Sequence, residues 1–115
     1  MDAAWIRLPA VAGRPAAAYF TLHGGKSDAQ LVAVRTMAAR AELHESMANG
    51  MRPTPAVTVP AGGTVTFTPG GRHVMIFGLD PALTAGQRVT LHGKLADGRG
   101  VSAMATVVGP ADPAP

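Results

Sequence analysis

Histidine and methionine are the residues of this chain whose types and spacing could do chemistry. The 115 residues include four His and six Met, and one residue separates His73 from Met75. In a β-strand, residues two apart point to the same face, so His73 and Met75 would project together while Val74 and Ile76 face the other way. One imidazole and one thioether would then lie side by side.

A second group of such residues begins at His44. Met47 and Met51 follow it closely, and the Asn49-Gly50 pair between them favours a tight turn. That turn would fold Met51 back toward His44. Arg52-Pro53 then leads the chain away in an extended conformation, as the residue before a proline prefers.

Two imidazoles and two thioethers together favour copper. Thioether sulfur is soft and suits Cu(I), whereas imidazole binds copper in either oxidation state, so Cu(I) is the expected ion and Cu(II) a second candidate. Zn(II) prefers imidazole, carboxylate or thiolate, and Mg(II) and Ca(II) require oxygen. The spacing alone does not bring the two groups together, so ordinary core methionines and polar histidines are the alternative interpretation.

The composition excludes several other function classes. The chain has no Cys, which excludes disulfides, thiolate zinc sites, a cysteine nucleophile and a blue-copper site. The net charge is +3, but the basic residues are scattered and aromatic residues are few, so no nucleic-acid partner is expected. Position 48 is Ala where a zinc-hydrolase motif starting at His44 needs His, and no Ser lies in a nucleophile elbow. We therefore expect no enzyme.

Short alternating runs between Gly and Pro turns predict that β-strands position the candidate ligands. The expected fold is all-β, a single antiparallel β-sandwich. A short helix within Ala33 to Glu45 is the alternative for that segment, because Ala38, Ala39 and Arg40 are good helix formers. The predicted strands are Trp5–Leu8, Ala16–His23, Gln30–Thr36, Ala41–Glu45, Ala56–Val59, Thr64–Thr68, His73–Phe77, Gln87–Leu95 and Gly100–Val108.

The length fits one domain. We assign residues 1–108 to a copper-binding β-sandwich domain and the Pro- and Ala-rich residues 109–115 to a flexible tail. No stretch approaches the roughly 20 apolar residues that span a bilayer. The first residues lack the charged and apolar regions of a secretory signal. We expect a monomer.

The remaining candidates receive structural roles. His23 is expected at a loop edge and His92 on the solvent-exposed face of its strand, while Met104 is expected in the core. Trp5 is expected as a core or sheet-edge anchor, and Met37 has no assigned role.

The ligand candidates also carry a family resemblance. The sequence resembles the PCuAC family of periplasmic copper chaperones, whose pattern is a His, a spaced Met, about 21 residues and then His-x-Met; 21 residues separate Met51 from His73 here. The resemblance implies a metal site of His44, Met51, His73 and Met75. Its flanking matches include Glu42-Leu43-His44-Glu45, Met51-Arg52-Pro53, Val59-Pro60-Ala61-Gly62-Gly63 and Pro69-Gly70-Gly71-Arg72, and it extends over most of the chain.

One spacing departs from the family pattern. The family usually has ten residues between the first His and the Met, whereas six separate His44 from Met51, so this loop is four residues shorter. Met47 thereby becomes an auxiliary or substitute candidate. We favour Met51 because the Met-Arg-Pro context follows it.

The resemblance implies a cupredoxin-like sandwich, with Ig-like Greek-key connections, that binds Cu(I) at one end and delivers it. The implied recipient is the copper centre of cytochrome c oxidase, reached directly or through a thiol-containing assembly factor. The implied location is periplasmic or otherwise extracytoplasmic, with a cleaved signal or a lipid anchor. Arg52 and Arg72 would either present positive charge to an acidic partner or serve solubility. A copper-storing buffer and a metal-free Ig-like interaction module are the alternative functions.

Overall fold

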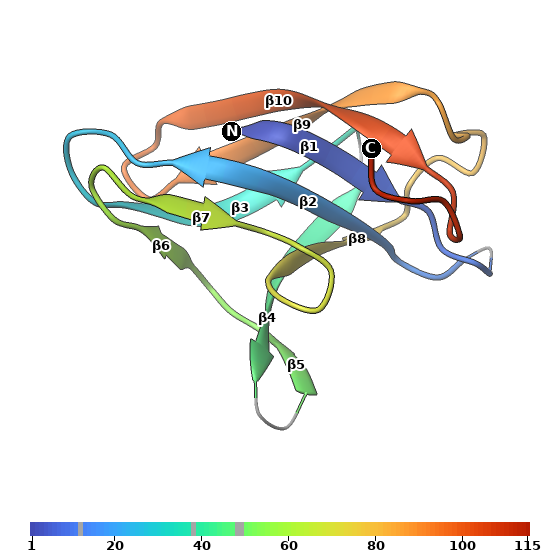
Figure 1. Ribbon diagram of the computed structural model, residues 1–115, viewed down its shortest axis with the longest axis horizontal. Helices are drawn as coiled ribbons and strands as arrows, with labels where there is room; N and C mark the ends of the chain where they lie inside the picture. The colour runs from blue at the N-terminus through green and yellow to red at the C-terminus, as the bar shows by residue number, and fades with distance from the viewer. Residues whose placement is uncertain (12, 38, 48–49) are drawn as a thin grey trace.

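The chain folds almost entirely into β-strands. The computed structural model describes residues 1–11, 13–37, 39–47 and 50–115, and for Ser46, Met47 and Met51 it describes the backbone only. The all-β prediction is confirmed for these residues (Figure 1). The strands are β1 Asp2–Arg7, β2 Ala16–His23, β3 Ala29–Arg35, β4 Arg40–Met47, β5 Gly50–Pro53, β6 Val57–Val59, β7 Thr64–Thr66, β8 His73–Phe77, β9 Arg88–Leu95 and β10 Gly100–Val108.

The strands form one curled sheet that encloses the core. Their order is β5-β4-β8-β2-β1-β10-β9-β3-β6, and β7 also pairs with β2. The predicted antiparallel arrangement is confirmed for the other strand pairs, whereas β1 and β10 pair in parallel. These strands lie at opposite ends of the chain, so no hairpin imposes an antiparallel direction on them.

The segment between β3 and β4 contains the clearest local corrections. The helix considered for residues 33–45 is wrong where the structure describes that segment: Thr36 and Ala39 form an isolated antiparallel bridge, and Met37 has a φ of 53°. Leu43 on β4 is buried in the core. Burial of one face of a strand against the core outweighs the helix propensity of the alanines here. Ala38 lies outside the described residues.

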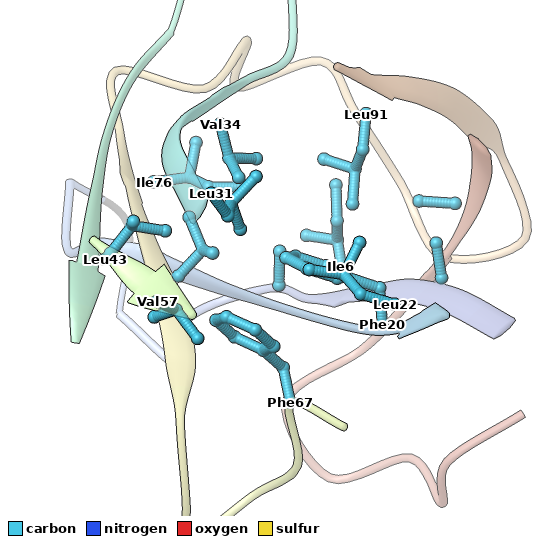
Figure 2. Close-up of a cluster of buried hydrophobic side chains, with 14 of the residues drawn as sticks. Ile6, Phe20, Leu22, Leu31, Val34, Leu43, Val57, Phe67, Ile76 and Leu91 are labelled. Atoms are coloured by element: carbon cyan, nitrogen blue, oxygen red, sulfur yellow. The ribbon is translucent and has the colours of Figure 1, made fainter. Parts of the chain in front are cut away.

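Aliphatic and aromatic side chains from both halves of the sheet fill the interior. Phe20 and Phe67 stack there with ring centroids 4.4 Å apart, and Figure 2 shows them among aliphatic neighbours. Met104 is not part of this core, contrary to expectation, because it is 47% exposed. Its neighbour Ala105 is fully buried, so the alternation of β10 turns Met104 outward, where the Thr90 hydroxyl donates to its sulfur at 3.1 Å.

The other expected roles agree with the structure. His23 is exposed and lies 2.9 Å from the Asp2 carboxylate, and His92 is exposed on β9. Trp5 is buried beside Tyr19, with ring centroids 4.5 Å apart. Met37 is exposed.

After β10 the chain turns back against β1. Asp112 accepts a hydrogen bond from the Gly109 backbone N–H at 2.7 Å, and Arg7 donates to the Asp112 carbonyl at 3.0 Å. No helix in the described part of the chain has the length and apolarity needed to cross a membrane.

Candidate metal centre

Strand β8 presents its His-x-Met pair away from the core. Val74 and Ile76 are almost completely buried, whereas His73 and Met75 are partly exposed. This alternation is the one that period 2 predicts. The imidazole and the thioether therefore lie on the outer face of the sheet, supported from behind by two aliphatic side chains.

The neighbouring strand β4 brings His44 to the same place. β4 and β8 are antiparallel, with His44 directly opposite His73 and Glu42 opposite Met75. The two imidazole rings stack at a centroid distance of 5.3 Å with 23° between their planes. His44 is only 8% exposed although it is polar. The two groups that the sequence left apart thus meet across one strand pair.

Each imidazole has one nitrogen in a hydrogen bond. His73 Nδ1 donates to the Gly71 carbonyl at 3.3 Å, and His44 Nε2 donates to the Glu42 carboxylate at 3.1 Å. A carbonyl and a carboxylate only accept, so these contacts place the proton on the bonded nitrogen of each neutral ring. The second nitrogen of each ring keeps its lone pair.

The second nitrogen of His44 points to a binding position. His44 Nδ1 is buried and pairs with no other group among the residues that the structure describes. A buried polar atom without a partner costs free energy, and it often marks the position of a bound water or ion. This nitrogen is the strongest indication in the structure of a ligand-binding position.

Glu42 is itself held in place. Arg40 Nη1 donates to the second carboxylate oxygen at 3.0 Å, and the Arg40 guanidinium lies 4.4 Å from the centroid of the Phe77 ring. The hydrogen bonds from His44 and then from Arg40 lower the pKa of Glu42 below its ordinary value of 4.5. The carboxylate is therefore ionised at neutral pH and acts as an acceptor.

These donors suit a soft ion better than a hard one. The described residues contain no group of three or more His, Cys, Asp or Glu that could hold a metal. Two imidazoles fall short of the ligand number that zinc requires. The Glu42 carboxylate on this face already accepts from His44 and Arg40, and the Met75 thioether lies opposite it. Imidazole with thioether is a donor set for copper, above all Cu(I).

Met47 and Met51 are placed by their backbones alone. β4 and β5 form a hairpin in which Ser46 pairs with Met51 and Met47 with Gly50. The sequence predicted no strand over residues 50–53 but an extended Arg52-Pro53, and the structure has the edge strand β5 there, a position that tolerates Pro53. The hairpin projects from the body of the sheet in Figure 1. The side chains of both methionines lie outside the described part. Residues 48 and 49 also lie outside it, so the predicted turn at Asn49-Gly50 is not described in full.

Sequence reasoning missed Glu42 and Arg40. Glu42 and Arg40 precede His44 by two and four residues, and residues separated by an even number share a strand face. That signal could have identified a carboxylate next to the imidazole. Arg52 and Arg72, which flank the ligand candidates, are both exposed.

Comparison with known families identifies the chain. A family model described as "Putative lipoprotein LpqE-like" matches residues 1–107. The chain belongs to the LpqE-like family. A relative from Leifsonia xyli subsp. xyli, named "Putative lipoprotein Lxx21020", is 32% identical over 101 residues, which cover 83% of this LpqE-like chain and 60% of the relative. The chain thus spans about 60% of the length of the curated relative it matches.

Solved PCuAC domains have the same fold as this LpqE-like chain. The "Copper-bound PCuAC domain from PmoF2" has a TM-score of 0.79 at 20% identity and covers 95% of this chain and 91% of that one. The solution structure of CuI-DR1885 from Deinococcus radiodurans has a TM-score of 0.74 at 35% identity and covers 91% of this chain and 74% of that one. These neighbours confirm the expected cupredoxin-like fold.

Proposed function

We propose that this protein is a copper(I)-binding metallochaperone. The observation that carries the proposal is the stacked pair of His44 and His73 on the same sheet face as Met75. One buried nitrogen of this pair has no partner within the part of the chain that the structure describes. The relative from Deinococcus radiodurans, named as a CuI form, supports the choice of ion, since it is 35% identical. Cu(II) is a second candidate because imidazole binds both oxidation states.

The proposed ligands are His44, Met51, His73 and Met75. Met51 pairs with Ser46, and position 46 belongs to the same face of β4 as position 44, so the register supports Met51 as the hairpin ligand. Met47 pairs with Gly50, one position further along, and is the auxiliary or substitute candidate. Two nitrogens and two sulfurs would complete a four-coordinate site.

Copper would be cargo in this protein. The chain has no Cys, so the site would hold Cu(I) by neutral donors, and a thiolate acceptor would compete well for the ion. We propose delivery to a copper-accepting protein, with the copper centre of cytochrome c oxidase or its thiol-containing assembly factor as the recipient. Exposed Arg52 and Arg72 would attract an acidic partner surface.

The proposal includes the setting of the domain. The LpqE-like family description and the Leifsonia xyli relative both name lipoproteins, which supports an extracytoplasmic, membrane-anchored location. Residues 1–108 would form the copper-binding domain, and residues 109–115 its tail. No catalytic step is assigned to it.

Anaerobic Cu(I) titration against a chromophoric chelator tests copper binding. We expect binding near one equivalent and X-ray absorption from both nitrogen and sulfur ligands. Absence of tight Cu(I) binding would overturn the proposal in favour of a metal-free interaction module. Transfer is tested with the metal-free copper domain of cytochrome c oxidase and with a dithiol acceptor. Copper retained against both acceptors would instead identify a storage buffer.

A further inference from the structure

We infer that Glu42 is a positioning residue that fixes the protonation pattern of His44, so that His44 offers Nδ1 to the metal. The inference rests on the proposed function, because it concerns how that copper site is prepared. Glu42 would not touch the ion. It would act through the imidazole that does.

The hydrogen-bond geometry determines which nitrogen carries the proton. Glu42 Oε1 lies 3.1 Å from His44 Nε2 and can only accept, so Nε2 bears the hydrogen. The lone pair is then on Nδ1, the buried atom that has no partner among the described residues. The opposite tautomer would leave two acceptors facing each other at Nε2 and would put a proton on the nitrogen offered to copper.

The carboxylate is fixed from its other side. Arg40 donates to Oε2 at 3.0 Å and packs over the Phe77 ring, whose residue is the cross-strand partner of Arg40. One oxygen of Glu42 is thereby occupied, and the second faces His44. Carboxylates behind metal-bound imidazoles fix ring orientation and raise ligand basicity, and their loss typically weakens metal binding by about 10 to 100-fold.

The test compares Glu42→Leu, Glu42→Gln and a matched control, Glu45→Gln. Glu45 lies on the same strand but makes no side-chain hydrogen bond within the described residues. The first readout is the imidazole ¹⁵N shifts of His44 in the metal-free protein at about pH 8, where imidazole is neutral. The second is the Cu(I) Kd from chelator competition.

We expect the wild type and Glu45→Gln to show a single Nε2–H tautomer. Glu42→Leu should show a mixture and a Kd raised by about 10 to 100-fold. Glu42→Gln keeps a carbonyl acceptor, so it should retain more of the Nε2–H form than Glu42→Leu does. Backbone amide spectra check that every variant is folded.

Two results would overturn the inference: an Nδ1–H tautomer in the wild type, or an unchanged tautomer and Kd in Glu42→Leu. Failure of the proposed function looks different. If the wild type bound no Cu(I), the copper proposal would fall, while the metal-free spectra would still decide whether Glu42 sets the tautomer.

Discussion

His44 and His73 are direct partners across the antiparallel β4–β8 pair, with ring centroids 5.3 Å apart. Two paired strands carry these rings, and each ring has one nitrogen held by a hydrogen bond. Donors on strands are placed more accurately than donors on loops. The imidazole half of the proposed site would therefore be formed before an ion arrives, and methionine would complete it.

Replacing one ring should remove most of the copper affinity. We expect His73→Ala to raise the Cu(I) Kd by at least about 100-fold. Losing only an outer-sphere partner of a ligand can weaken binding by that much, and this variant loses the ligand itself. The loss follows because a single imidazole and the thioethers remain. The unfolding temperature should change little, since His73 is only half buried. Anaerobic chelator competition measures the affinity, and circular dichroism measures the unfolding.

His92→Ala is the matched control for that variant. His92 is also a strand histidine, but it is exposed on β9, where it pairs with Ser102. Its loss should leave the Kd unchanged. Equal weakening in both variants would contradict the assignment, because it would mean that copper binds to surface imidazoles in general.

Removing each thioether in turn should show which of the two hairpin methionines, Met47 or Met51, is the copper ligand. We expect Met51→Ala to weaken Cu(I) binding and to lower the sulfur ligand count measured by X-ray absorption, whereas Met47→Ala should change neither. The register supports this order, because Met51 pairs with Ser46 on the His44 face of β4. Met104→Ala removes an exposed thioether on β10 and serves as the control. The reverse result would assign the ligand role to Met47.

The sequence predicted which side chains share a strand face better than it predicted which strands pair. Period 2 correctly placed His73 and Met75 on one side of β8, because alternation is a local property. It could not say that β4 lies beside β8, since strand pairing depends on how the whole sheet curls. The structure adds that the Glu42 carboxylate binds His44 Nε2 and that Nδ1 has no partner among the described residues. The family resemblance supplied the link between the two clusters that spacing could not.

The errors have similar causes. Met104 was expected in the core because its neighbours are apolar, but the phase of β10 is set by buried Ala105 and Val107. No strand was predicted over residues 50–53, although Arg52-Pro53 was expected to be extended, and an edge strand accepts Pro53 there. The parallel β1–β10 pair joins the two ends of the fold, a contact that no local pattern encodes.

Two adjacent glycines should respond very differently to alanine. A Cβ at Gly24 would collide with the Pro60 carbonyl oxygen, because the turn after β2 packs against the turn before β7. A Cβ at Gly25 would meet nothing within 4 Å. We expect Gly24→Ala to destabilise the protein by about 1–3 kcal/mol, the usual cost of overpacking. Gly25→Ala should have little effect. Urea unfolding measures both, and equal stabilities would show that the turns separate easily.

The turn between β9 and β10 should lose stability in acid. Asp97 accepts hydrogen bonds from the Arg99 backbone N–H at 2.9 Å and from Arg99 Nε at 2.7 Å. These contacts, the backbone one first, lower the pKa of Asp97 below its ordinary value of 3.8. The folded protein thus binds this proton less readily than the unfolded chain does. The contribution of Asp97 to stability is complete above pH 3.8 and is lost as the pH falls through the lowered pKa.

Asp97→Asn isolates that charge, because asparagine keeps the shape of the side chain and an oxygen that accepts from the Arg99 backbone N–H. We expect its unfolding temperature to lie below that of the wild type at neutral pH. The difference should shrink as the pH falls below 3.8, where the wild-type carboxylate becomes protonated. Added salt at neutral pH should also reduce the difference, since the pair with Arg99 is exposed and therefore screened. A gap that stayed constant from neutral to strongly acidic pH would mean that the Asp97 charge does not stabilise this turn.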